Sequence, residues 1–76
     1  MNYETIEFTE KCPSRIQILA KLKPLVKNGA NAIEIIWGEN WLKVERHSYH
    51  GNWYGMGHIR KIAADTLAKE LNNQRG

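Results

Sequence analysis

The segment 55–64 (GMGHIRKIAA) combines two glycines, a histidine and two adjacent bases, which together could bind a phosphate group. Glycines such as Gly57 let the backbone leave a strand and approach a ligand closely. If a helix begins near His58, its free N–H groups and the positive end of its dipole would face that ligand. Arg60 and Lys61 would then lie in the first turn, where the dipole disfavours cations and a bound phosphate would offset the repulsion. We expect an anion site here; the alternative is a tight turn with solvated bases.

The stretch 41–54 interleaves aromatic rings with bases, a pattern that suits two kinds of partner. Aromatic rings stack on nucleotide bases while cations pair with phosphates. Trp, Tyr and Arg also dominate the energetics of protein–protein interfaces. The residues expected to contact nucleic acid are Lys43, Arg46, Gly57, His58, Arg60 and Lys61. The residues expected to form an interaction surface are Trp41, His47, Tyr49, Trp53 and Tyr54. The alternative for Trp41 is that it covers the open face of the sheet or packs under the first helix, because large aromatic side chains are usually mostly buried.

Three histidines, His47, His50 and His58, have the side chains best suited to metal binding or acid–base catalysis. Their spacing matches no recognised metal pattern, and no acidic partner can be identified for them. We therefore expect no metal site, no cofactor and no catalytic residue. A small ribonuclease toxin that uses one of these histidines is an alternative, although a general base needs a partner group. The single cysteine, Cys12, excludes an internal disulfide.

The charge of the chain is unevenly distributed. The net charge of the 76 residues is +3, but residues 1–10 carry three glutamates and no base, whereas the remainder carries all eleven bases and five acids. Such a basic body attracts polyanions or an acidic protein partner. No run approaches the ~18 apolar residues of a membrane span. An N-terminus without bases does not resemble a signal or transit peptide, and we expect a cytoplasmic location.

The first half of the chain predicts a strand and a helix. Alternation over 3–9 predicts a half-buried strand at a sheet edge. A helix is expected to begin near Pro13 or Ser14 and to end or kink near Lys23, because Pro24 removes a backbone donor. Asn28 and Gly29 form a stop signal.

The second half predicts a three-stranded meander followed by a helix. The strands are expected at 32–37, 41–49 and 53–57, the helix at 58–71, and a frayed tail at 72–76. Pairing the first two strands places Ile33, Ile35, Trp37, Leu42 and Val44 on one apolar face. The predicted fold is therefore a single α+β domain over residues 1–76, in the order β-α-β-β-β-α, with an antiparallel sheet and its helices packed on one face.

A meander, a Gly-x-Gly turn, a basic pair and an alanine-rich helix resemble the C-terminal half of double-stranded-RNA-binding domains. The resemblance covers roughly residues 14–71, and its motif lies in 55–68. In that family the start of the last helix holds phosphates across a groove. Arg60 and Lys61 match those positions, whereas Ala64 stands where a further lysine is expected.

Two other resemblances point to phage. The stretch 41–72 is similar to the arm-binding domains of phage-type integrases, and the ending 67–76 (LAKELNNQRG) is similar to small early-region proteins of lambdoid phages. These similarities imply a phage or prophage accessory protein.

The sequence therefore predicts a small non-catalytic accessory protein that binds nucleic acid, either duplex DNA or duplex RNA. The alternative is a protein-binding inhibitor or adaptor that acts on a host nuclease or defence complex. A ribonuclease toxin is the third hypothesis. The sequence determines neither the type of nucleic acid nor the oligomeric state.

Overall fold

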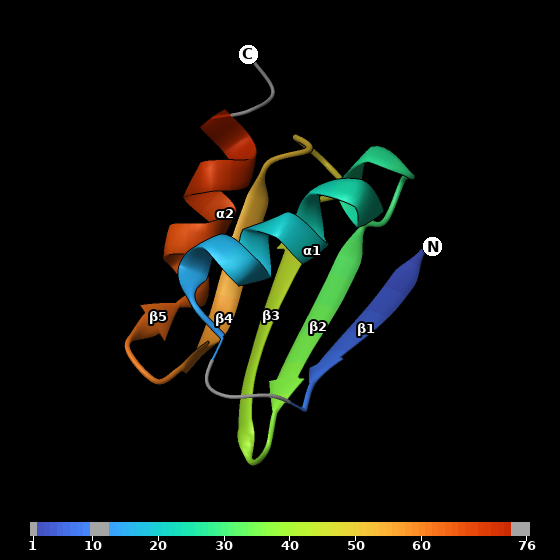
Figure 1. Ribbon diagram of the computed structural model, residues 1–76. Coiled ribbons are helices and arrows are strands. Elements are labelled where there is room, and N and C mark those ends of the chain that lie inside the picture. The colour runs from blue at the N-terminus through green and yellow to red at the C-terminus, as the bar shows by residue number, and fades with distance from the viewer. Residues whose placement is uncertain (1, 10–12, 74–76) are drawn as a thin grey trace.

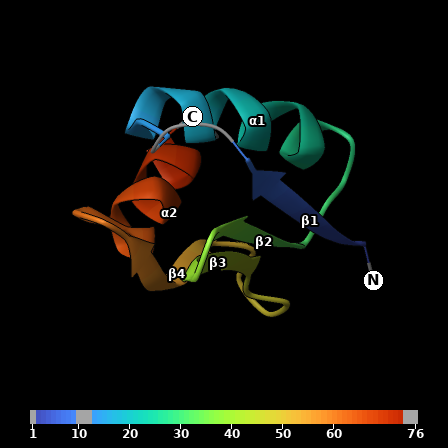
Figure 2. The same cartoon turned by 60° about the horizontal axis from the view of Figure 1, so that its bottom comes forward.

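The computed structural model describes residues 2–9 and 13–73 and shows a five-stranded sheet with both helices on one face (Figures 1 and 2). The elements are β1 (Tyr3–Phe8), α1 (Arg15–Lys27), β2 (Ala32–Trp37), β3 (Asn40–Arg46), β4 (Trp53–Ile59), β5 (Ile62–Ala63) and α2 (Ala64–Asn73). The strands lie side by side in sequence order, with β1 and β5 at the edges. The α+β class is therefore confirmed, as is the edge position of the first strand. Cys12 lies outside the described residues.

One pair of strands differs from the expected antiparallel arrangement. β1 runs parallel to β2, whereas the pairs β2–β3, β3–β4 and β4–β5 are antiparallel. The expectation of a purely antiparallel sheet is wrong for β1, because α1 crosses over the sheet and returns the chain to the end where β1 begins. The register places Ile6 beside Ile35 and Phe8 beside Trp37, so the apolar side of β1 still faces the helices.

The core lies between the sheet and the two helices. The predicted apolar face of β2 and β3 is confirmed, because Ile33, Ile35, Leu42 and Val44 have no exposed surface and Trp37 packs against them. The helices and β4 complete this core with Ile18, Leu22, Trp53, Ile59, Leu67 and Leu71. Burial on one side only leaves the opposite face of the sheet without a covering layer (Figure 2).

Helix α1 continues one turn beyond its expected end. Ser14 caps it with a capping box, in which the side chain accepts from the Gln17 N–H and the Gln17 side chain accepts from the Ser14 N–H. The helix does not end near Lys23, because Pro24 lies on its exposed side and still accepts a hydrogen bond from the N–H of Asn28. The predicted stop at Asn28 and Gly29 is confirmed.

Helix α2 begins at Ala64, six residues after the expected start at His58. β4 continues to Ile59, and a tight turn then leads into β5. Ile59 and Ile62 are paired across this hairpin. Their spacing of three residues also fits the period of a helix, which is why the helix was predicted to begin too early. α2 includes Asn72 and Asn73, the first two residues of the predicted frayed tail, whereas residues 74–76 lie outside the described residues.

Two contacts fix α2 on β4. A Cβ atom at Gly55 would overlap the backbone of Ala64, so the glycine permits the helix to begin directly against the strand. At the other end, the Trp53 N–H donates to Asn72 Oδ1 (2.7 Å) and the Trp53 C=O accepts from Asn72 Nδ2 (3.0 Å). The Asn72 amide thus occupies the edge of β4 as a further strand would. Within residues 2–9 and 13–73, no helix has the length and apolar character to cross a membrane.

Candidate interaction surface

The side of the sheet opposite the helices carries a mixed aromatic and charged surface, which we call the open sheet face. Its members alternate with the core residues along β1 to β4 and lie in cross-strand rows. They are Tyr3, Thr5, Glu7, Glu34, Ile36, Trp41, Lys43, Glu45, Tyr54, Met56 and His58. No other layer of the described chain covers this face (Figure 2).

Four large apolar side chains are exposed on the open sheet face. The exposed fractions are 50% for Tyr3, 38% for Trp41, 39% for Tyr54 and 49% for Met56. The alternative that packs Trp41 under the first helix is therefore wrong, whereas the alternative that places it over the open face of the sheet agrees with its position. Trp53, in contrast, is only 4% exposed and belongs to the core, so its expected role in an interaction surface is wrong. Its position on the helix side of β4 follows from the alternation that places Tyr54 outside.

Carboxylates hold these aromatic side chains in place. Trp41 donates its indole N–H to Glu34, and Tyr54 donates its hydroxyl proton to Glu45. The Lys43 ammonium lies 2.9 Å from Glu45 Oε2 and 5.7 Å from the centroid of the Tyr3 ring. The face is therefore ordered by contacts between neighbouring strands before any partner binds.

The protonation states of this network follow from its hydrogen bonds. Donation from Tyr54, and then from Lys43, lowers the pKa of the Glu45 carboxyl below its ordinary value. The bond to Glu45 raises the pKa of the Tyr54 phenol and is the main cause of the raised pKa of Lys43. At neutral pH the carboxylate and the ammonium are both charged, and the phenol keeps its proton.

The open sheet face is acidic, although the chain as a whole is basic. It carries three carboxylates, Glu7, Glu34 and Glu45, against the single ammonium of Lys43. Such a surface repels phosphate groups and attracts cations. The exposed aromatic side chains of this face are therefore surrounded by the wrong charge for a nucleic-acid backbone.

The structure does not gather the predicted phosphate-binding residues into one site. Lys43 is paired with Glu45 at the centre of the open sheet face, whereas Arg46, at one end of β3, donates from Nε to the Gly51 C=O (3.1 Å). Arg46 lies beside the first residue of β4, and Arg60 follows the last. These two arginines are separated by about 20 Å, the length of a seven-residue strand.

The expected anion site at a helix start is not formed. Arg60 and Lys61 occupy the turn between β4 and β5, and the first turn of α2 carries an acid, Asp65. Arg60 has a φ of 54° and its guanidinium lies 5.7 Å from the centroid of the Trp37 ring. The prediction that these bases lie in the first turn of a helix is therefore wrong, because the chain forms a hairpin turn at Arg60 and Lys61 before α2 begins.

The two remaining residues of the predicted nucleic-acid set lie beside Trp41. Gly57 has a φ of 85°, and a Cβ there would overlap the carbonyl and the ring of Trp41. The glycine thus makes room for the indole instead of approaching a ligand. His58 is the cross-strand neighbour of Trp41 on the open sheet face.

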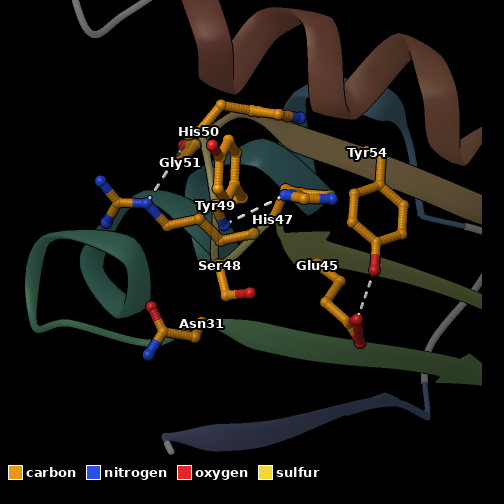
Figure 3. Close-up of a pocket in the computed structure, with 9 residues that line it drawn as sticks. Asn31, Glu45, His47, Ser48, Tyr49, His50, Gly51 and Tyr54 are labelled. Atoms are coloured by element: carbon orange, nitrogen blue, oxygen red, sulfur yellow. Dashed lines mark hydrogen bonds between the residues drawn. The ribbon is translucent and has the colours of Figure 1, made fainter.

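A loop extends one end of the open sheet face (Figure 3). The rings of His47 and His50 stack at 4.1 Å, and the ring of His47 meets that of Tyr54 edge-on at 6.3 Å. Tyr49 is exposed at the tip of this loop. A hollow of about 730 Å³ lies here, lined by Asn31, Glu45, Arg46, His47, Ser48, Tyr49, His50, Gly51 and Tyr54. His47, Tyr49 and Tyr54 thus lie near one another, as an interaction surface requires.

The loop histidines are used for backbone bonds. His47 Nδ1 accepts from the Tyr49 N–H (3.1 Å), and His50 Nδ1 accepts from the Asn52 N–H (3.2 Å). A neutral imidazole that accepts a hydrogen bond at Nδ1 carries its proton on Nε2. Among residues 2–9 and 13–73, no group of three or more His, Cys, Asp or Glu side chains could hold a metal ion.

The contribution of the first two strands to the open sheet face was not predicted from the sequence. Tyr3 joins the open sheet face because β1 pairs with β2, which no local pattern revealed. Glu34 lies there because it alternates with Ile33 and Ile35, so the predicted alternation of β2 was sufficient to place it. Met56 was missed because the alternation of the third strand was not followed, although the expected strand contained this residue. Continuing the alternation of Tyr54 would have identified Met56, whereas His58, the next residue in that series, was already among the predicted nucleic-acid contacts.

Comparison of the chain with protein-family models, with curated proteins and with solved structures finds no match.

Proposed function

We propose that this protein is a non-catalytic protein-binding module that uses the open sheet face and the adjoining loop as its contact surface. The observation that supports this proposal is the set of exposed, ordered aromatic side chains on a face that no helix of the described chain covers. Exposed Trp and Tyr side chains contribute large contact areas and lose little entropy on binding when they are already held in place.

The charge of the face favours a partner with basic groups. Glu7, Glu34 and Glu45 outnumber Lys43, so contact with an acidic protein would bring like charges together. This differs from the acidic partner that the net charge alone suggests. Proteins that bind nucleic acid carry basic surfaces, so a host nuclease or a defence complex fits the required chemistry. We therefore favour an inhibitor or adaptor of such a protein.

A capture experiment with matched variants tests the proposal. The full chain and a Trp41→Ala, Met56→Ser variant are used to capture proteins from a host extract, and the affinity for each captured protein is then measured. We expect the double variant to bind at least ~10-fold more weakly, as for residues at the centre of an interface. Ile16→Ala is the matched control, because Ile16 is exposed on α1 on the opposite side of the sheet. Equal binding by all three proteins would reject the open sheet face as the contact surface.

A second candidate function is nucleic-acid binding at the β4–β5 turn. Arg60 and Lys61 are both exposed there, and neither takes part in an ion pair among the described side chains. Two adjacent cations at a projecting turn can contact phosphates without base specificity. The suggested phage or prophage origin rests on the sequence resemblances alone.

A gel-shift assay separates the two candidates. Duplex DNA, duplex RNA and single strands are tested at two salt concentrations against the full chain and an Arg60→Ala, Lys61→Ala variant. If the turn binds phosphates, affinity falls steeply with salt and the variant binds every sequence more weakly. Trp41→Ala should leave this binding unchanged. Retention that does not respond to the removal of both bases would reject the second candidate.

A further inference from the structure

The outer edge of β1 is an unpaired strand edge. β1 hydrogen-bonds to β2 on one side, and none of the described strands lies on the other. The Asn2 C=O is directed at β2, where it accepts from the N–H groups of Asn31 and Ala32. Since successive residues of a strand point their backbone groups to opposite sides, Tyr3, Thr5 and Glu7 direct their N–H and C=O groups outward. These residues present the hydrogen-bonding pattern that an additional strand requires.

A groove accompanies this edge. Two hollows of about 560 and 290 Å³ lie between β1 and α1, and both are lined by Ile6, Glu7, Ala20 and Lys21. The half-buried side chains of Ile6 and Leu25 contribute apolar surface to it. Figure 2 shows α1 passing over the sheet beside β1. A strand added about 4.8 Å from β1 would direct every second side chain into this groove.

The other edges of the sheet are protected. β5 has two residues, which is too short to align a partner strand. The outer side of β4 is covered by α2, and Asn72 occupies both backbone groups of Trp53 there. Among the described strands, β1 therefore combines the longest free edge with an adjacent apolar groove.

We propose that the outer edge of β1 binds an extended peptide of a partner protein as an additional strand. Alternate apolar side chains of the peptide enter the groove beside α1, and a basic side chain lies near Glu4 and Glu7. These two carboxylates outnumber the single ammonium of Lys21 along the groove, so a cationic segment is favoured over an acidic one. This site adjoins the open sheet face and shares Tyr3, Thr5 and Glu7 with it, but it does not depend on the function proposed for that face.

A second copy of the chain is a poor occupant of this edge. Pairing two β1 strands would bring four glutamates together, two from each copy, along one short ladder. Like charges on neighbouring strands destabilise their pairing, and edge charges commonly prevent self-association. The same carboxylates would stabilise a basic peptide.

The probe is a pool of capped eight-residue peptides in which valine or isoleucine alternates with threonine and a lysine stands near each end. The full chain, labelled for NMR, is titrated with this pool. We expect the amide signals of Tyr3, Thr5 and Glu7 to shift and to gain protection from hydrogen exchange, with a Kd tighter than about 1 mM. A second pool, with glutamate in place of lysine, should bind at least ~5-fold more weakly. No binding at about 1 mM, or shifts centred on other residues, would overturn the proposal.

Variants at the edge give an independent check. Thr5→Pro removes an outward N–H that β2 does not use, and it should weaken binding of the lysine pool at least ~10-fold. Thr5→Ala is the control and should bind as the unmodified chain does. If Thr5→Pro fails to fold, the Glu4→Lys, Glu7→Lys variant decides, because it should reverse the preference between the two pools.

Two further results would show either that the peptide binds at another surface or that the β1 edge binds another partner. Trp41→Ala should not change peptide binding, since Trp41 lies on the open sheet face; a loss of binding would assign the peptide to that face. Concentration-dependent dimerisation that shifts the β1 amides without peptide would assign the edge to a second copy. Either result would contradict the proposal.

Discussion

Glu45 connects the side chains that order one half of the open sheet face. Its carboxylate accepts the Tyr54 hydroxyl and pairs with Lys43, and the Lys43 ammonium in turn lies near the Tyr3 ring. Each contact restricts a side chain that would otherwise rotate freely. Because ordering side chains costs free energy on binding, a face arranged in advance binds more tightly than a disordered one.

The first prediction concerns the pH dependence of this network. Glu45→Gln should lower the free energy of unfolding at pH 7 by about 0.5–1 kcal/mol, because a partly exposed charged hydrogen bond and ion pair are weakened. The pKa of Glu45 is lowered by folding from its ordinary value of 4.5. The stability from its ionised form is therefore complete above pH 4.5 and is lost as the pH falls through the lower pKa of the folded state.

Urea denaturation of both proteins at pH 7 and well below pH 4.5 tests this prediction. The difference between them should be largest at pH 7 and should shrink on acidification. Glu39→Gln is the control, because Glu39 is exposed in the turn between β2 and β3. A difference that stays constant across the pH range would show that ionisation of Glu45 is not the cause.

At the scale of elements, the hairpin of β4 and β5 marks the limit of prediction from local pattern. β2 matches its predicted bounds because of its β-branched residues and alternation. β3 begins one residue early and ends at Arg46, three residues before its predicted end, because a loop replaces the last part of the alternating stretch. The segment 58–63 instead carries a histidine, two bases and two isoleucines three residues apart, which fit a helix start and a hairpin equally well. The hairpin forms because it buries Ile59 in the core, a tertiary contact that no local pattern encodes.

The second prediction uses a substitution to glycine at Arg60 to distinguish the hairpin from a helix start. Arg60 adopts a φ of 54°, which costs a residue with a Cβ about 1 kcal/mol. Arg60→Gly removes this strain and loses an exposed contact with Trp37 worth about 0.5 kcal/mol, so the hairpin should be unchanged or slightly more stable. In a helix, the same change would destabilise by about 1 kcal/mol. Thermal unfolding of this variant, with Lys61→Gly as the matched control, distinguishes the two.

The third prediction concerns the junction between α2 and β4. Asn72→Ala removes both bonds to the Trp53 backbone and leaves a partly buried N–H and C=O without these partners. We expect a loss of about 1–3 kcal/mol in the free energy of unfolding and faster hydrogen exchange of the Trp53 amide. Asn73→Ala, at an exposed neighbouring position, should have little effect. Equal losses from the two variants would show that helix propensity, not the strand-like contact, explains the result.

At the scale of the whole molecule, the candidate surface is a product of topology. The alternation of β3 and β4 is sufficient to assign their exposed aromatic residues to one face of the sheet and their core residues to the other. The addition of Tyr3 from the other end of the chain requires the parallel pairing of β1 with β2, which depends on how α1 crosses the sheet. A pairing between distant segments leaves no periodic signal in either of them, so this part of the site could not be predicted.

The fourth prediction follows from burial on one side of the sheet only. Leu42 and Trp41 are neighbours on β3, but Leu42 has no exposed surface, whereas Trp41 faces solvent. Leu42→Ala should lower the free energy of unfolding by about 2–5 kcal/mol through the lost burial and the cavity that remains. That is a large part of the total, because a chain of this length is stabilised by about 4–11 kcal/mol. Trp41→Ala should cost about 1 kcal/mol or less, since its ring loses only partial packing and one exposed hydrogen bond to Glu34.

Urea denaturation of the two variants measures this difference in the free energy of unfolding. A cost for Trp41→Ala equal to that for Leu42→Ala would mean that the tryptophan is needed for folding, and the open sheet face would then lose its main side chain as a free contact surface.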